Sequence, residues 1–391
     1  MINEVKKLAT KYFDVVLELR RNLHQNPELS FQEFNTSLLV QEFLKKHNIS
    51  FKSGFVKTGI VAEIEGEKKS NKELVLRADM DALPIKEENE VPYKSKNEGV
   101  MHACGHDVHT SSMLGTILIL NNLKHLFGGK IKFIFQPGEE KLPGGASLMI
   151  KEGVLEPAPN CCFAQHVFPE LEAGKVGFKE GTYMASADEI YITIKGKGGH
   201  AALPHKLKDP VLMSAQIITS LQQVISRNNN PENPSVLSFG FIEAKGATNV
   251  IPDTVKLKGT FRTFDEKWRF EAHELIKNIV SSICTSSGGE CEIDIKVGYP
   301  FLINNPTLTI KTKQSATEYL GKENVVDLSL RMTSEDFSFF SQAAPSCFYR
   351  LGTGDGKTER KLHTSTFDIN EDALRTSFGL MAYIALKEIN S

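Results

Sequence analysis

The chain has 391 residues, a length that favours two domains over a single hydrophobic core. Hydrophobic residues make up 40% and charged residues 24%, as in folded soluble proteins, and the formal net charge of −2 argues against nucleic acid or a membrane as a partner. Charges appear from the first residues and no apolar region follows them, so we expect no signal peptide, no membrane segment and a cytoplasmic location.

The N-terminal part is predicted to form two amphipathic helices. Apolar residues recur near one face of residues 3–25, which predicts a helix that ends before Pro27. Ser30 and Glu33 have the spacing of a capping box, in which two side chains satisfy free backbone N–H groups at the start of a helix. We therefore expect a second helix to follow this pair and to run to about Lys46.

Strands and helices alternate in the following segment. The loop at 65–72, between the first two expected strands, is charged and contains glycine, which favours a β-hairpin. Near-continuous apolar strands that alternate with helices indicate an α/β domain with a largely parallel or mixed central sheet. The expected strands are 61–64, 74–78, 131–135 and 161–165, and the expected helices are 111–123 and 145–153.

Residues 184–297 have an element order of their own. Asp209 before Pro210 gives an N-cap followed by proline at the first helical position, so a helix is expected to begin there. With a second helix at 266–282 and strands around both, the order is β-α-β-β-α-β, as in ferredoxin-like domains. Because α/β sequence flanks this segment on both sides, we expect it to be an inserted domain, after which the last block, 307–391, rejoins the first domain.

Acidic and histidine side chains follow the ends of the predicted strands. Ligands of open α/β sheets bind at the carboxyl ends of the strands. A carboxylate pair such as Glu139 and Glu140 allows one group to hold a metal ion while its neighbour moves protons. The residues at these strand ends are Asp79, Asp81, Glu139, Glu140, His166 and His363.

The densest cluster of potential ligands is HACGHDVH, residues 102–109. Cys104 and His106 can both reach one ion if the backbone turns between them, and Gly105 permits such a turn. Thiolate and imidazole suit zinc and other divalent ions. From the residues alone, two other interpretations stay open: a structural zinc site, for which a second local ligand pair is missing, and a nucleophilic cysteine activated by a histidine.

At these residues the sequence resembles the amidohydrolase branch of the aminoacylase/carboxypeptidase-type metallopeptidase superfamily. That branch includes hippurate hydrolase, N-acyl-L-amino acid amidohydrolase, N-acetyldiaminopimelate deacetylase and the indole-acetyl-amino acid hydrolases. The motifs occur in order over nearly the whole chain, and together they are highly specific. They are RRNLH (20–24), NPE (26–28), RADMDALP (77–84), MHACGHD (101–107), FQPGEE (135–140), GGH (198–200), NVIP (249–252), SEDF (334–337) and LH (362–363).

The resemblance implies a centre with two divalent metal ions. Cys104 would bridge the ions as a thiolate. His106 and His166 would complete one site, and Glu140 and His363 would complete the other. This ligand set suits zinc or manganese best among the expected ions, and cobalt and nickel also tolerate it.

The resemblance also implies roles for residues around the ions. Glu139 would be the general base and acid, and Asp81 would stand behind a metal ligand. His200 and Asn249 of the inserted domain would face the active site, where the histidine steadies the developing oxyanion and, in dimeric relatives, comes from the partner subunit.

Two neighbouring side chains receive no role from the resemblance. Asp79 stands where other branches of the superfamily carry a metal-binding histidine. His109 lies outside the matched ligand set, and we expect it to pack on the helix that follows.

Together these features predict a metal-dependent amidohydrolase that cleaves N-acyl-L-amino acids. A dipeptidase or aminopeptidase on the same fold and a non-catalytic metal-binding relative are the alternatives; an intact Glu139 argues against the latter. The implied catalytic domain comprises residues 1–182 and 296–391, and the inserted domain, residues 183–295, would serve as lid and as the surface of a homodimer. The expected partner is a small N-acyl amino acid or short peptide.

Overall fold

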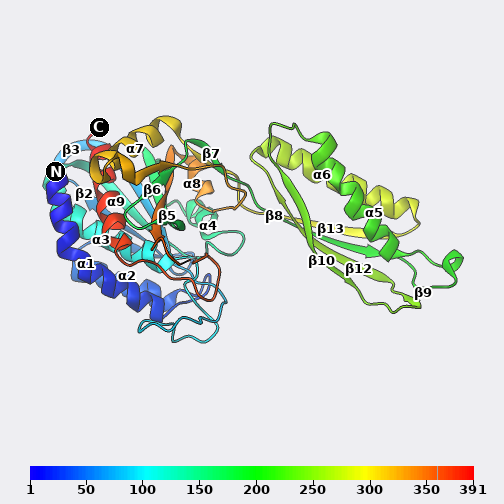
Figure 1. The fold of residues 1–391 in the computed structure, drawn as a ribbon. Coiled ribbons are helices and arrows are strands. Elements are labelled where there is room, and N and C mark those ends of the chain that lie inside the picture. The colour runs from blue at the N-terminus through cyan, green and yellow to red at the C-terminus, as the bar shows by residue number, and fades with distance from the viewer. Residues whose placement is uncertain (359) are drawn as a thin grey trace. The chain divides into compact units, whose positions relative to one another are not determined.

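The computed structural model describes residues 1–358 and 360–391. The chain forms two compact units (Figure 1). Unit 1 contains Met1–Tyr183, Ile303–Leu330 and Asp336–Ser391, and unit 2 contains Met184–Leu302 and Arg331–Glu335.

Unit 1 is built on an eight-stranded mixed sheet. Its strands are β1 (Ser50–Phe55), β2 (Gly59–Glu65), β3 (Lys68–Asp79), β4 (Gly128–Gln136), β5 (Cys161–Glu172), β6 (Val176–Phe178), β15 (Val325–Asp327) and β16 (Ser346–Gly354). They lie in the order β1-β2-β4-β3-β5-β16-β6-β15. The central strands β4, β3, β5 and β16 are parallel, whereas β1, β2 and β4 pair antiparallel. The predicted α/β class with a mixed sheet is therefore confirmed.

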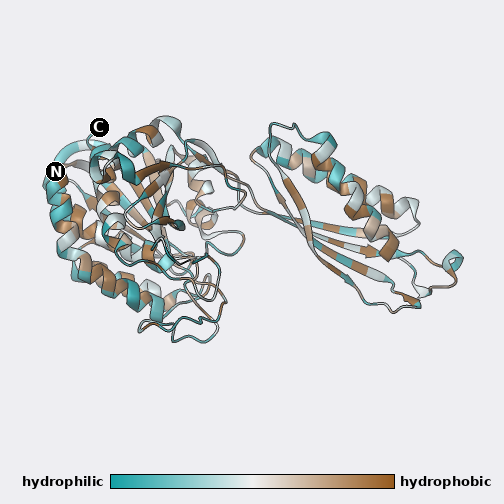
Figure 2. Cartoon of the chain, in the orientation of Figure 1, coloured by the Kyte–Doolittle hydropathy of each residue, from teal (hydrophilic) through white to brown (hydrophobic). Residues whose placement is uncertain are grey.

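The helices of unit 1 supply most of the remaining core. They are α1 (Ile2–Gln25), α2 (Phe34–Lys46), α3 (His106–Asn122), α4 (Gly145–Lys151), α7 (Pro306–Leu320), α8 (Ser338–Ala343) and α9 (Ala373–Ile389). α3 and α9 are buried along nearly their whole length and pack against each other and α1. α9 is mostly apolar and suits the interior, whereas the first turns of α3 bury polar side chains and the two-faced α1 lies at the surface (Figure 2).

The predicted hairpin between the first two strands is wrong. In the structure β4 lies between β2 and β3, antiparallel to the first and parallel to the second. The charged residues 68–72 belong to the exposed start of β3 rather than to a turn, and only the later residues of this strand are buried. The segment resembled a loop in sequence because this exposed and irregular part of the strand is polar and charged.

The capping box predicted at Ser30 and Glu33 is also wrong. α2 begins at Phe34, and it is Glu28 that accepts hydrogen bonds from backbone N–H groups of its first turn, 2.8 Å from Thr36 N and 3.1 Å from Asn35 N. Glu33 accepts from the backbone N–H of Phe31 rather than from that of Ser30, and both side chains of the expected pair also bind segments distant in sequence. Non-local partners therefore override the local pattern.

Unit 2 contains a four-stranded antiparallel sheet with two helices packed on it. The elements are β8 (Asp188–Lys195), β9 (Gly199–His200), α5 (Pro210–Gln223), β10 (Val236–Ala244), β11 (Val250–Ile251), β12 (Thr254–Arg262), α6 (Glu266–Ser286) and β13 (Glu290–Val297). The main sheet has the order β10-β12-β8-β13, and β9 pairs with β11 separately. The predicted cap is confirmed: Asp209 accepts from Val211 N and Leu212 N at the start of α5. The short strands β7 (Gly181–Met184) and β14 (Leu302–Asn304) lie where the chain changes units.

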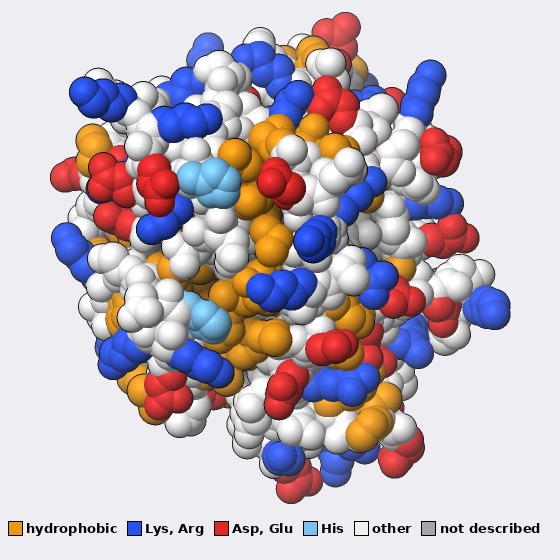
Figure 3. Space-filling view, turned by 90° about the vertical axis from the view of Figure 1, so that its left-hand side faces the viewer, with side chains coloured by type: hydrophobic (Ala, Val, Ile, Leu, Met, Phe, Trp, Pro, Cys, Tyr) orange, Lys and Arg blue, Asp and Glu red, His pale blue; other side chains and the backbone are white. Residues whose placement is uncertain are grey.

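The surface carries charges of both signs. Lys and Arg side chains are interspersed with Asp and Glu on the face drawn in Figure 3, in keeping with the formal net charge of −2. Over residues 1–358 and 360–391, none of the helices has the length and apolar composition needed to cross a membrane.

Candidate metal centre

A tight turn before α3 brings Cys104 and His106 to the same place. Gly105 is the N-cap of this helix and has a φ of +80°, a left-handed conformation that favours glycine. A Cβ atom at this position would lie 2.5 Å from Cγ2 of Val167, so strand β5 approaches too closely for any side chain. The helix begins at His106, earlier than the sequence predicts, and this places the imidazole in its first turn.

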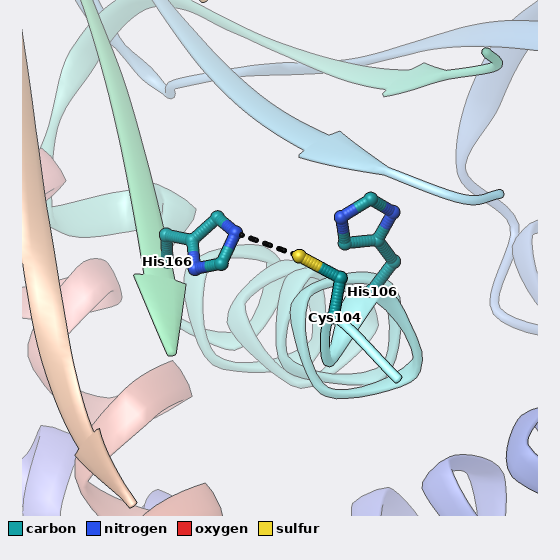
Figure 4. Close-up of side chains that lie close together, drawn as sticks. All are labelled: Cys104, His106 and His166. Carbon is teal, nitrogen blue, oxygen red and sulfur yellow. Dashed lines mark hydrogen bonds between the residues drawn. The ribbon is translucent and has the colours of Figure 1, made fainter. Parts of the chain in front are cut away.

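The first group of converging donors consists of Cys104, His106 and His166 (Figure 4). One donor atom from each lies within 4.8 Å of the others, and Sγ of Cys104 is 3.4 Å from Nε2 of His166. Nδ1 of His166 is 2.8 Å from the backbone carbonyl of Val167, to which it donates, so the lone pair is on Nε2. All three side chains are buried.

A second group shares Cys104 and adds Glu140 and His363. Nε2 of His363 lies 3.3 Å from Sγ of Cys104 and 3.2 Å from Oε1 of Glu140. His363 has a φ of +61°, and its backbone N–H donates to the carbonyl of Ala103 at 2.8 Å, which fixes this loop residue beside the turn. The thiol is thus the common member of two three-residue groups.

The donor atoms fit divalent cations. Among the described residues, Nε2 of His106 is buried without a hydrogen-bond partner, which is costly unless another ligand is provided. Burial and the carboxylates of Glu140, Glu139 and Asp79 raise the pKa of the Cys104 thiol well above its usual range when no cation is present. A divalent cation reverses this effect, because it stabilises the thiolate directly.

Asp81 connects the ligands to the carboxylate pair. Its Oδ1 lies 3.2 Å from Nδ1 of His106 and accepts from the backbone N–H of Glu139 at 3.1 Å. Its Oδ2 accepts from the backbone N–H of Glu140 at 3.0 Å and from the hydroxyl of Ser30 at 2.6 Å. Although burial lowers the pKa of His106, the carboxylates of Asp79 and Asp81 raise it to about 10 in the absence of cations.

Glu139 lies beside the two donor groups, and two contacts that the sequence did not reveal hold it there. Its Oε1 accepts from the backbone N–H of Asp336 at 3.4 Å. The preceding Gly138 donates its N–H to Glu33 at 2.9 Å. Burial, followed by the charge of Asp81, raises the pKa of Glu33 to about 7. Neither contact has a local signal, because both partners are far away in sequence.

His109 does not pack on the helix that follows, as the sequence suggested, but belongs to α3 itself. Nδ1 lies 2.6 Å from Oδ1 of Asp79, and Nε2 accepts from the backbone N–H of Val167 at 3.0 Å. Asp79, His106 and His109 also form a cluster compact enough for an ion. Because both ring nitrogens of His109 already have partners, this cluster is a hydrogen-bonded group rather than an ion site.

His200 and Asn249 belong to unit 2, whereas the metal-ligand candidates belong to unit 1. Both residues are exposed. His200 lies on β9, opposite Val250 of β11, and the carbonyl of Asn249 accepts from the backbone N–H of Ala201 at 3.0 Å. The structure therefore brings these two residues together on one short ribbon.

Comparison with known proteins supports a hydrolytic function. A thermostable carboxypeptidase of Saccharolobus solfataricus is 38% identical over 396 residues, covering 99% of this chain and 98% of the relative. An N-acyl-L-amino acid amidohydrolase of Geobacillus stearothermophilus is 42% identical over 301 residues, covering 77% and 81%. A Bacillus subtilis structure described as a dinuclear metal-binding peptidase from the M20 family superposes with a TM-score of 0.82 at 32% identity, covering 97% and 99%.

The family profile matches residues 75–387, which include the turn before α3, the carboxylate pair and His363. The resemblance inferred from the motifs is thereby confirmed. The chain belongs to Peptidase family M20/M25/M40 and is a hydrolase of that family.

Proposed function

We propose that this hydrolase is an amidohydrolase that cleaves the amide bond of N-acyl-L-amino acids and uses two divalent metal ions. The observation that carries the proposal is the pair of donor groups that share Cys104, next to Glu139. In our proposal His106 and His166 hold one ion, and Glu140 and His363 hold the other. Zinc or manganese is the expected ion, with cobalt and nickel as alternatives, because thiolate, imidazole and carboxylate accept all four.

The ions would lower the pKa of the attacking water and polarise the scissile carbonyl. Glu139 takes the proton from that water and passes it to the nitrogen of the leaving amine, so one carboxylate serves first as base and then as acid. The backbone N–H of Asp336 holds the Glu139 carboxylate, and Asp81 holds its backbone. Asp81 also orients the ring of His106 through Nδ1.

Unit 2 supplies the remaining parts of the proposal. Its β-α-β-β-α-β order supports the ferredoxin-like inserted domain expected for residues 183–295, between the catalytic segments 1–182 and 296–391. His200 would donate a hydrogen bond to the developing oxyanion, and Asn249 would support the same ribbon. The homodimer through this domain and the cytoplasmic location stay predictions.

A second candidate, peptide hydrolysis, is favoured by one observation. The carboxypeptidase relative matches almost the whole chain, so a short peptide whose N-terminal residue takes the place of the acyl group would use the same groups. Both candidates need the same carbonyl polarisation and the same proton transfer, and they differ only in the acyl pocket.

The test is hydrolysis of a panel of N-acetyl and N-benzoyl amino acids and short peptides, before and after chelation. We expect free amino acid to be released, the release to stop after chelation, and zinc or manganese to restore it. The preferred substrate decides between acylamino acids and peptides. A metal-loaded protein that hydrolyses no member of the panel would contradict both candidates.

A further inference from the structure

Asp79 and His109 form a buried pair that the proposed reaction does not use directly. Oδ1 of Asp79 lies 2.6 Å from Nδ1 of His109, and both side chains are almost inaccessible to solvent. The other ring nitrogen of His109 accepts from the backbone N–H of Val167. A ring that donates through Nδ1 and accepts through Nε2 is neutral and has a single tautomer, so its orientation is fixed from both ends.

The fixed ring of His109 lies against two of the candidate metal ligands. Its centroid is 5.4 Å from that of His106, with the planes 30° apart, and 4.7 Å from that of His166. Val167, which donates to this ring, is the next residue after His166 in β5. His109 therefore restrains one ligand by stacking and the other by both ring packing and the backbone.

A single guanidinium group supports this pair and the general base together. Arg77 donates to Oδ2 of Asp79 at 2.5 Å and to Oδ1 of Asp336 at 2.6 Å. Gln136 completes the network, because it accepts from Nε of Arg77 at 2.8 Å and donates to Asp336. Asp336 in turn holds Oε1 of Glu139 through its backbone N–H.

The charged groups of this network are paired with each other and hydrogen-bonded. Both carboxylate oxygens of Asp79 accept hydrogen bonds, one from Arg77 and the other from His109. Asp336 accepts a further hydrogen bond from the backbone N–H of Ala146 at 3.0 Å. A buried arginine whose two carboxylate partners are hydrogen-bonded in this way is held rigidly. Removal of any member would leave a buried charge without compensation.

We propose that Arg77, Asp79 and His109 are positioning residues, which hold His106 and His166 in their metal-binding orientation and couple them through Asp336 to Glu139. The inference rests on the proposed function, because it assigns these residues a task at the proposed metal centre. It gives Asp79 a role as a hydrogen-bond acceptor in place of the metal-binding role that a histidine at this position has elsewhere in the superfamily.

The experiment measures zinc affinity, by competition with a chromophoric chelator, for the parent protein and for His109→Phe. Phenylalanine keeps a flat ring between the two ligands but offers neither the donor nor the acceptor. We expect at least one zinc-binding step to weaken by about 10–100-fold, the effect typical of residues behind metal ligands. His109→Gln, whose amide oxygen can still accept from Val167 N–H, should recover part of this loss.

Thr116→Val is the matched control. Thr116 is equally buried in α3, but its hydroxyl donates to the backbone carbonyls of Ser112 and Phe378, away from the donor groups. This variant can lower the thermal stability, whereas its zinc affinities should equal those of the parent protein. A merely structural effect would lower stability in both variants without separating their zinc affinities.

Folded His109→Phe protein with parent-like zinc affinities would overturn the inference. If that variant does not fold, Asp79→Asn takes its place, with the same expectation and the same contradicting result. Zinc binding by the parent protein distinguishes a failure of this inference from a failure of the proposed function. A parent that binds no zinc contradicts the metal centre itself, whereas a zinc-binding parent with unaffected variants contradicts only the positioning network.

Discussion

The site residues of the two units differ in how firmly they are held. In unit 1 the side chains of Cys104, His106 and His166 are buried, and the second ring nitrogen of each histidine already has a partner. In unit 2 His200 and Asn249 are exposed on a two-stranded ribbon. Donors that are buried and hydrogen-bonded to neighbouring groups are preorganised, whereas an exposed ribbon can adapt to a substrate. In the proposed assignment, metal binding depends on unit 1 and oxyanion stabilisation on unit 2, so we expect the two properties to be separable by mutation.

The largest effect is expected for Cys104→Ala, because both donor groups lose their shared thiolate. Zinc affinity should fall by more than about 100-fold, beyond the loss typical of residues that only support ligands, and turnover should fall with it. Zinc content after dialysis and hydrolysis rates measure the two effects. Cys347→Ala, which removes another buried free thiol outside both groups, should keep the zinc. Equal zinc content in the two variants would argue against a bridging thiolate.

Glu139→Gln should separate chemistry from metal binding inside unit 1. Glutamine retains the acceptor for the N–H of Asp336 but cannot take a proton from water, so turnover should fall by about 10²–10⁴-fold while zinc content stays constant. The neighbouring Glu140→Gln should instead lose zinc, since Glu140 belongs to a donor group. Unchanged turnover of the first variant would exclude Glu139 as the base.

His200→Ala tests the contribution of unit 2. Loss of one oxyanion donor should lower turnover by about 10²–10³-fold and leave zinc affinity and thermal stability unchanged, because the side chain is exposed. His205→Ala, an exposed histidine of the same unit, serves as the control and should have the parent rate. If both variants turn over at the parent rate, the oxyanion contact does not come from this ribbon.

The smallest expected effect concerns stability rather than turnover. Burial raises the pKa of Glu33 from about 4.5 to about 7, so the folded, metal-free protein binds this proton more tightly than the unfolded chain. The contribution of Glu33 to the free energy of unfolding is therefore most favourable below about pH 4.5. It decreases by about 3 kcal/mol in total as the pH rises to about 7.

Glu33→Gln removes this dependence. The amide can still accept from Gly138 N–H and can donate to Thr58, so the variant should be the more stable protein above pH 7. Urea unfolding of both metal-free proteins at several pH values measures the difference, which should shrink toward pH 4.5. A constant difference would show that Glu33 does not titrate as described.

The sequence revealed those features that depend on neighbouring residues. The N-cap at Asp209 was predicted correctly because the cap and the N–H groups that it accepts from lie within three residues. The turn at Gly105 was predictable for the same reason, since the conformational freedom of glycine is a local property. Family motifs then extended the prediction to ligands that are distant in sequence.

Long-range partners account for what the sequence did not reveal. The insertion of β4 between β2 and β3 is a pairing choice that no local pattern encodes. Glu33 resembled half of a capping box, yet besides the N–H of Phe31 it binds Thr58 and Gly138, which lie 25 and 105 residues away. Asp336 lies 197 residues from Glu139, so its contact with the proposed base had no signal in spacing or composition.

The most direct test of the proposed centre is a zinc titration of the chelator-treated protein, with release of amino acid from an N-acyl substrate followed at each step. Because two donor groups share Cys104, activity should be absent at the start and should reach its maximum at two ions per chain. Full activity in the chelated protein, or saturation without any bound zinc, would contradict a metal-dependent amidohydrolase.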